Sequence, residues 1–202
     1  MAGTITLNTP RLSLRRHVPE DAEILYQSFG TDAAMYRYSG WNPYTTPEQA
    51  RETVQRFIDS YADPRFYGWA IEREDRMIGT IGAYDFDPER DQIEVGFSIE
   101  RANWGKGYAA EALRAVLEYL TVQEGIAHVT AWCASDNIAS GRTMEKAGMR
   151  LSGIDTGGLE VDGQQYDRLD YIYSDKESEW GSRPCPWKRR EGYPSERAMV
   201  HG

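Results

Sequence analysis

The sequence predicts an α/β domain built on one mixed, mostly antiparallel sheet with helices on both faces. Two observations predict this fold class. Segments with strand-like alternation and segments with helical spacing follow in the order strand, two helices, three or more strands, helix, strand, helix, strands. In addition, a strand pattern at residues 93–99 leads through a glycine-containing loop into a long amphipathic helix.

The first part of the chain predicts one strand followed by two helices. Residues 11–15 alternate as a strand does, and residues 19–30 open with a proline and two acids, which is typical of a helix start. Thr46 caps the second helix, with Pro47 at its first position and Gln49 completing a capping box. Apolar residues follow at helical spacing, namely Ala50, Val54, Phe57, Ile58 and Tyr61.

The middle of the chain predicts a hairpin and a third strand. Residues 69–72 and 77–84 read as strands, and the polar residues 74–76 between them form a tight turn. Residues 85–92 are rich in charge and predict a loop. Residues 93–99 are the next strand, which places at least three strands side by side in this region.

Two helices then flank a buried strand. The long helix runs from about residue 108 to 123, and residues 128–133 are β-branched and apolar, which predicts a buried strand. Residues 137–147 have the pattern of a short helix. Gly148 ends that helix as the residue after its last turn.

The last regular elements are predicted to be two strands, at 149–154 and 166–173, with Asp-Gly at 162–163 as the turn signal. From about residue 176 proline, tryptophan and basic residues follow without any period. We therefore expect one domain over residues 1–175 and an irregular C-terminal extension over residues 176–202.

The composition narrows the class of function. The chain has 202 residues, is 40% hydrophobic and carries a formal net charge of −9, which argues against nucleic acid as a partner. An acidic surface suits a cationic substrate such as an amine, although it also serves solubility alone. Two cysteines give neither a disulfide framework nor a metal spacing, so no metal is expected. Without a signal peptide or a membrane-length apolar run, we expect a cytoplasmic protein with no membrane partner.

The glycine pair Gly105 and Gly107 is the most informative local feature. The two glycines stand where a strand pattern gives way to a helix pattern. Such a loop lets backbone N–H groups approach a phosphate at the positive end of the helix. Taken alone, the pattern is equally compatible with an ordinary strand-to-helix turn.

Four motifs, in order and at consistent spacing, carry a family resemblance: 78–82 (IGTIG), 94–97 (EVGF), 104–113 (WGKGYAAEAL) and 137–149 (NIASGRTMEKAGM). Together they make the chain resemble the GNAT acetyltransferases, within them the ribosomal-protein N-terminal alanine and serine acetyltransferases. The resemblance covers about residues 9–174. It implies acetyl-CoA as co-substrate, a primary amine as acceptor and, as often in this family, a homodimer.

Gly96 inside a strand pattern predicts a β-bulge, unless it only relieves sheet twist. In the family, such a bulge parts this strand from the one that begins near residue 128, and the gap admits the pantetheine arm, while a backbone N–H, here that of Phe97, stabilises the oxyanion. The resemblance implies acetyl-CoA contacts from Phe97, Ser98, Ile99, Trp104, Gly105, Lys106, Gly107, Tyr108, Ala109, Asn137, Ser140 and Lys146.

Some of these positions have plainer explanations. Packing beneath the loop is the favoured account of Trp104, and a solvated lysine explains Lys106 equally well. The family's phosphate loop begins with glutamine or arginine, whereas this chain has Ala102 there, with Arg101 beside it. Whether Arg101 reaches the phosphates is open.

Acetyl transfer to an amine needs a base and a proton donor for the leaving thiolate. Glu94, just before Gly96, is the first candidate base, with Glu160 near the last hairpin as the second, and a half-exposed strand carboxylate as the plain alternative. The resemblance implies that Asn137 binds pantetheine and that Ser140 donates the proton. Helix capping and a surface hydroxyl are their alternatives. Cys133 lies in a buried strand, so we expect direct attack in a ternary complex.

The aromatic residues before the second helix are the candidate acceptor wall, because aromatic faces hold cationic amines. They are Tyr36, Tyr38, Trp41 and Tyr44, and loop packing is an equal alternative. The acceptor is a protein N-terminus or a small amine. Two other hypotheses remain at this point: a non-catalytic acetyl-CoA-binding sensor or regulatory module, and an interaction protein that docks through its tail.

Overall fold

The computed structural model describes residues 1–39 and 42–174, and within them one eight-stranded sheet runs through the molecule in the order β1-β2-β3-β4-β5-β6-β8-β7. All neighbouring strands are antiparallel except β5 and β6, which are parallel. The predicted mixed, mostly antiparallel α/β fold is therefore confirmed. The strands are β1 (Leu7–Asn8), β2 (Ser13–Arg15), β3 (Tyr67–Arg73), β4 (Arg76–Asp87), β5 (Gln92–Ile99), β6 (His128–Ala134), β7 (Arg150–Val161) and β8 (Gln164–Tyr173).

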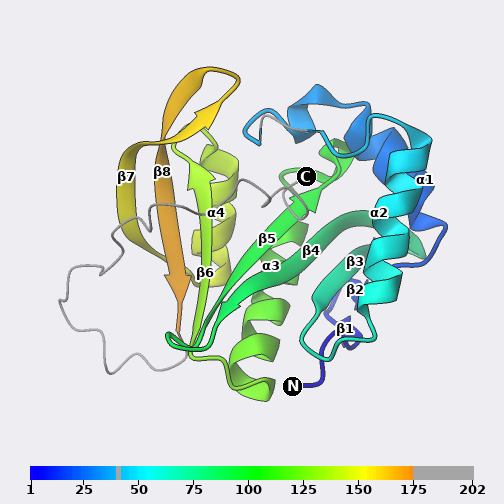
Figure 1. Cartoon of the computed structure of the whole chain (residues 1–202), viewed down its shortest axis with the longest axis horizontal. Helices are drawn as coiled ribbons and strands as arrows, with labels where there is room; N and C mark the ends of the chain where they lie inside the picture. The colour runs from blue at the N-terminus through cyan, green and yellow to red at the C-terminus, as the bar shows by residue number, and fades with distance from the viewer. Residues whose placement is uncertain (40–41, 175–202) are drawn as a thin grey trace.

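Helices cover both faces of this sheet (Figure 1). The first face carries α1 (Asp21–Ile24), which continues as a π-helical turn (Leu25–Gly30), and α2 (Pro47–Ser60). The second carries α3 (Tyr108–Glu118), which ends in a π-helical turn (Tyr119–Gln123), and α4 (Ile138–Ala147). Short 3-10 turns precede α2 at Ala33–Met35 and α3 at Arg101–Asn103.

Each face has its own hydrophobic core. The larger core joins the sheet to α3 and α4 through fully buried side chains such as Trp69, Leu113 and Leu117. The smaller lies under α1 and α2 around Leu25 and Phe29. The sheet is therefore a rigid middle layer, and its strand ends can position a site.

The helices lie close to where the local sequence patterns predicted them. The predicted capping box of α2 is confirmed, because the Thr46 side chain accepts the N–H of Gln49 while the Gln49 side chain accepts the N–H of Thr46. Strand lengths were less well predicted. The loop predicted over residues 85–92 is a shorter turn in the structure, because β4 reaches Asp87 and β5 begins at Gln92. β7 is longer than predicted and extends to Val161. The residues of these added strand segments are polar or rich in glycine, so their own sequence does not favour a strand. Hydrogen bonding to the neighbouring strand holds their backbone extended.

The predicted bulge at Gly96 is wrong. The β4–β5 register runs without a shift from the Gly79–Ile99 pair to the Tyr84–Glu94 pair, with Gly96 directly opposite Gly82. Two facing glycines leave enough room for a twisted ladder without an extra residue. The parting of β5 from β6, which the resemblance implied, occurs nevertheless, and it occurs on the other edge of β5.

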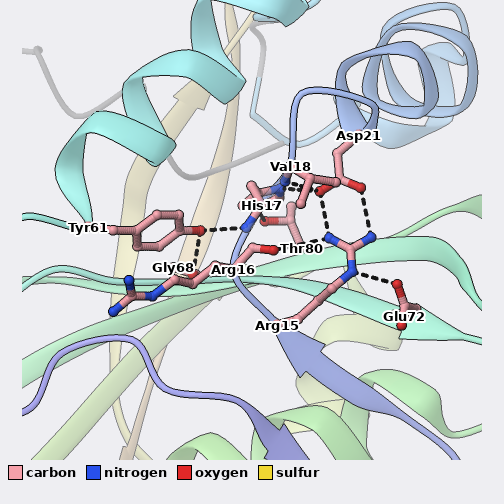
Figure 2. Close-up of polar contacts among 9 residues, drawn as sticks. All are labelled: Arg15, Arg16, His17, Val18, Asp21, Tyr61, Gly68, Glu72 and Thr80. Atoms are coloured by element: carbon pink, nitrogen blue, oxygen red, sulfur yellow. Dashed lines mark hydrogen bonds and ion pairs between the residues drawn. The ribbon is translucent and has the colours of Figure 1, made fainter.

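A buried polar cluster ties β2 to both helices of the first face, as Figure 2 shows. The Asp21 carboxylate accepts both terminal nitrogens of Arg15, at 2.8 and 2.9 Å, and the N–H of Val18 at 3.0 Å. His17 Nδ1 lies 3.2 Å from the same carboxylate. Burial disfavours the charge, but the hydrogen bonds from His17 and Arg15 hold the pKa of Asp21 well below its ordinary value.

Tyr61, which ends α2, connects the same cluster to β3. Its hydroxyl accepts the backbone N–H of His17 at 2.7 Å and donates to the Gly68 carbonyl at 3.0 Å. The His17 ring stacks on Phe57 with centroids 4.8 Å apart. The cluster therefore fixes the position of the α1–α2 layer on the sheet.

We predict that Asp21→Asn lowers the free energy of unfolding at pH 7 by roughly 3 kcal/mol, because it removes the buried carboxylate that Arg15, His17 and Val18 share and leaves Arg15 paired with Glu72 alone. The folded pKa of Asp21 lies below that of an unfolded aspartate, so the unfolded chain takes up this proton first as the pH falls. The stabilisation is complete above about pH 5 and declines progressively as the pH falls below about 4 toward the folded-state pKa. Urea unfolding of both proteins from pH 7 to pH 3 measures it.

The exposed Asp59→Asn on α2 is the matched control and should leave the unfolding curve nearly unchanged. A constant difference between wild type and Asp21→Asn across the pH range would contradict the assignment.

Candidate active site

A cleft opens where β5 and β6 part. The two strands pair over only three residues, Gln92 with His128, Ile93 with Val129 and Glu94 with Thr130. Beyond this point they enclose a cavity of about 660 Å³. Five segments line it: residues 95–99 of β5, residues 131–134 of β6, the loop and first turn of α3 within 103–110, the start and one face of α4 within 136–146, and residues 34–39 apart from Tyr36.

The glycine loop forms the end of the cleft at α3. Gly105 and Gly107 both have left-handed backbones, with φ of 74° and 82°, which explains why glycine stands at both positions. A Cβ on Gly105 would meet no atom within 4 Å, so the loop is open on that side. The first helical bond runs from the N–H of Glu111 to the Gly107 carbonyl, and the amides before it have no acceptor within the helix. The loop therefore fits an anion.

Trp104 does not lie beneath the glycine loop, where the sequence analysis expected it to pack. Its side chain is 48% exposed and lines the cleft, so packing beneath the loop is wrong. The indole N–H donates to the Ile99 carbonyl at 2.6 Å, which holds the ring on the surface of the loop. Lys106 is exposed and donates to Asn103 Oδ1 at 2.9 Å, while Arg101 lies 3.6 Å from Asp32.

The start of α4 faces the glycine loop across the cleft. The Asn137 side chain accepts the backbone N–H of Ser140 at 3.3 Å and so caps α4. Asn137 and Ser140 both line the cleft, as does Lys146 in the last turn of the helix. The structure thus brings together the glycine loop, β5 and this helix, which lie far apart in the sequence.

Glu94 stands at the point where the strands part, beside the cleft rather than in its lining. Its Oε1 accepts the indole N–H of Trp132 at 3.0 Å, and its Oε2 lies 4.0 Å from Arg168 Nη2. Trp132 itself lines the cleft. Glu160, the second candidate base, is exposed near the β7–β8 turn and does not line the cleft.

Asp170 is an acid near the cleft that sequence reasoning missed. It lies directly opposite Trp132 in the β6–β8 ladder. Burial raises its pKa above the ordinary value, although Arg168, 2.8 Å away, opposes the shift. Only the pairing of β6 with β8 brings it near Glu94, and no local pattern marks it.

Cys133 lies in the cleft as a buried thiol of β6. Burial raises its pKa to about 11, so the thiolate is scarce at neutral pH.

The four candidate acceptor aromatics lie in different places. Tyr38 lines the cleft, donates to the Asp136 carbonyl at 3.1 Å and contacts the Tyr166 ring edge-on at 5.9 Å. Tyr36 is half-buried outside the lining. Tyr44 is buried in the core under α1 and α2, where burial raises its pKa to about 12, so its assignment to the acceptor site is corrected. Trp41 lies outside the described residues.

Comparison with known proteins identifies the family. The acetyltransferase (GNAT) domain profile matches residues 11–150. YoaA, an uncharacterized N-acetyltransferase of Bacillus subtilis, is 32% identical over 80% of this chain and 92% of its own. The chain therefore belongs to the GNAT acetyltransferase family and is an enzyme, which removes the non-catalytic module from the hypotheses.

Two solved structures share the fold. RimL, the ribosomal L7/L12 alpha-N-protein acetyltransferase in complex with coenzyme A, has a TM-score of 0.76 at 19% identity and covers 84% of this chain and 98% of its own. The microcin C7 self-immunity acetyltransferase MccE, in complex with acetyl-CoA and AMP, has a TM-score of 0.72 at 17% identity, over 82% and 93%. Across the described residues, the structure has no helix long and apolar enough to cross a membrane.

We predict slow modification of Cys133 by a thiol reagent at pH 7.5. In a Cys185→Ser variant, which leaves Cys133 as the sole cysteine, the rate should rise about tenfold per pH unit between pH 7.5 and 9.5, as a thiol with a pKa near 11 requires. Stopped-flow absorbance with an aromatic disulfide measures it. A fast rate that is flat across this range would show a low-pKa thiolate and reopen the question of a covalent route.

Proposed function

We propose that this enzyme transfers an acetyl group from acetyl-CoA to a primary amine by direct attack in a ternary complex. The observation that carries the proposal is the parting of β5 and β6 beside the open, positive end of α3. Family membership supports N-acetyl transfer, and the complexes of MccE with acetyl-CoA and of RimL with coenzyme A support a coenzyme A thioester as donor. We assign the reaction to the cytoplasm.

The described residues fit such a donor. The amides from Gly105 to Ala109 suit a pyrophosphate, because they combine free donors with the positive end of a helix. The edge of β5 from Phe97 to Ile99 faces the gap and suits an extended pantetheine arm, which pairs like an added strand. Asn137 and Lys146 of α4 contact the same cleft from its far wall.

The chemistry uses three groups of this chain. The acceptor ammonium loses its proton toward Glu94, and the amine nitrogen then forms a bond to the acetyl carbon. The N–H of Phe97 stabilises the negative charge that develops on the carbonyl oxygen. As the carbon–sulfur bond breaks, the Ser140 hydroxyl gives its proton to the sulfur, which leaves as the free thiol, and Ser140 takes up the second proton that the nitrogen loses as the amide forms. Cys133 takes no part, because burial keeps it as a thiol.

The acceptor is a protein N-terminus or a small amine. Among the described members of the candidate group, Tyr38 is the aromatic residue that lines the cleft, and its ring offers a face to a cation. The acidic balance of the chain, −9, favours a cationic acceptor of either kind. The name of RimL, an alpha-N-protein acetyltransferase, supports the first kind.

Ser140→Ala is predicted to lower kcat at least about 100-fold while changing the Kd for acetyl-CoA by less than about twofold, because the lost hydroxyl acts on the leaving group. Release of free thiol across a panel of amines and N-terminal peptides gives kcat, and calorimetry gives Kd. Ser60→Ala on α2, which removes a surface hydroxyl, is the control. A normal kcat in Ser140→Ala would transfer the donor role elsewhere.

Glu94→Gln is predicted to lower kcat/KM about 100-fold and to remove the acidic limb of its pH profile. The amide keeps the shape that receives the Trp132 indole N–H and removes only the basic group. Asp170→Asn is the comparison. If Asp170→Asn removes the limb and Glu94→Gln keeps it, the base is Asp170.

A further inference from the structure

The carboxylate of Glu111 is held by the turn between β1 and β2. It sits in the first turn of α3, directly behind the glycine loop, with a side chain only 14% exposed. Its Oε1 accepts the Thr9 hydroxyl at 2.7 Å and the backbone N–H of Arg11 at 3.0 Å. Its Oε2 accepts Arg11 Nε at 2.6 Å. Burial opposes ionisation, yet the hydrogen bonds from Thr9 and Arg11 lower the pKa of Glu111.

Arg11 continues from Glu111 to the glycine loop itself. Its Nη1 donates to the Lys106 carbonyl at 3.1 Å, and its Nη2 lies 3.5 Å from the point where a Cβ on Gly107 would stand. Its guanidinium also lies 4.6 Å from the centre of the Tyr108 ring, and Arg73 of β3 lies 5.2 Å from it. One side chain thus contacts Lys106 and Tyr108 and lies beside Gly107 between them.

We propose that Arg11 is a positioning residue that holds the glycine loop in its phosphate-binding conformation and neutralises Glu111. The inference rests on the proposed use of acetyl-CoA. It deepens that proposal by naming the side chain that prepares the phosphate site.

The geometry separates this role from direct phosphate binding. Arg11 does not belong to the lining of the cleft, and its donors point to Glu111 and to Lys106. The loop is open at Gly105 and contacted by Arg11 at Gly107, so the guanidinium supports the loop from the side away from the cleft.

Charge gives a second reason for the pairing. Glu111 lies within one helical turn of the amides that suit a phosphate, and an unpaired carboxylate there would repel the anion. The charge-assisted bonds from Arg11 keep this negative charge paired. Arg11 therefore preserves both the shape of the loop and the positive potential at the end of α3.

The test compares two acetyl donors, one with phosphates and one without. For Arg11→Met we expect the Kd for acetyl-CoA, measured by calorimetry, to rise about tenfold. Turnover of acetyl-pantetheine, which lacks the nucleotide and its phosphates, should keep its kcat/KM within about twofold. Arg51→Met, which breaks an exposed pair with Glu48 on α2, is the matched control and should change neither value.

Two further variants distinguish a loss of loop support from misfolding. Arg11→Lys keeps the charge but loses the fork that spans Glu111 and Lys106, so we expect a smaller rise in Kd. Arg11→Met combined with Glu111→Gln removes both charges, and its Kd should fall between those of wild type and Arg11→Met. Thermal unfolding of each variant reports whether it is folded.

Either of two results overturns the inference. Unchanged acetyl-CoA affinity in folded Arg11→Met would show that the loop needs no support from Arg11. An equal loss with both donors would show a general structural defect instead of a phosphate-specific one. If the wild-type protein binds no acetyl-CoA, the proposed function fails, and this inference fails with it.

Discussion

The structure depends on a parallel strand pair that is left incomplete. β5 and β6 share three residue pairs and then diverge, although β5 stays paired with β4 from Glu94 to Ile99 on its other side. From Val95 onward, β5 therefore presents backbone donors and acceptors toward the cleft instead of toward β6. Backbone groups away from bulk water need a partner. An extended ligand can supply one, and this explains how a well-packed sheet also provides a binding surface.

The elements around this gap keep it open from both sides. α3 and α4 pack on one face of the sheet through the larger core, and each directs its first turn toward the cleft. On the other face, the cluster around Asp21 fixes the α1–α2 layer on the sheet. Most residues of the 34–39 segment, which connects α1 to α2, line the cleft. Tyr38 joins this layer to the segment before α4 through its bond to Asp136. The cleft is thus a product of several contacts between distant segments.

The electrostatic potential at the start of α3 differs in sign from the net charge of the chain. The chain as a whole is acidic, at −9, yet the start of α3 combines a helix N-terminus with a carboxylate that Arg11 keeps paired. Under the proposed function, the acidic surface attracts a cationic acceptor while this local region receives an anionic donor. Glu94 and Asp170 lie near the cleft, and Arg168 forms an ion pair with each of them. This shared positive charge offsets the repulsion between the two carboxylates. Burial raises the pKa of Asp170, and the neighbouring Arg168 opposes that shift.

The sequence by itself determined what depends on neighbours along the chain. The capping box at Thr46 and the glycine loop between a strand and α3 follow from local patterns, so residue type and spacing predict them, and helix capping, the alternative considered for Asn137, is what the structure shows there. The family resemblance supplied the roles of the candidate residues in the glycine loop and in α4, and the structure brings most of them to one cleft, with Lys106 outside its lining.

Only the tertiary structure decided which side chains face the cleft. Tyr44 is buried, Trp104 is exposed, and the parting of β5 from β6 needs no bulge at Gly96, because each outcome depends on partners from other elements. The bond between Thr9 and Glu111 joins residues 102 positions apart, beyond the reach of any periodic pattern. Periodicity reports which face of an element is apolar, whereas packing between distant elements sets what that face meets.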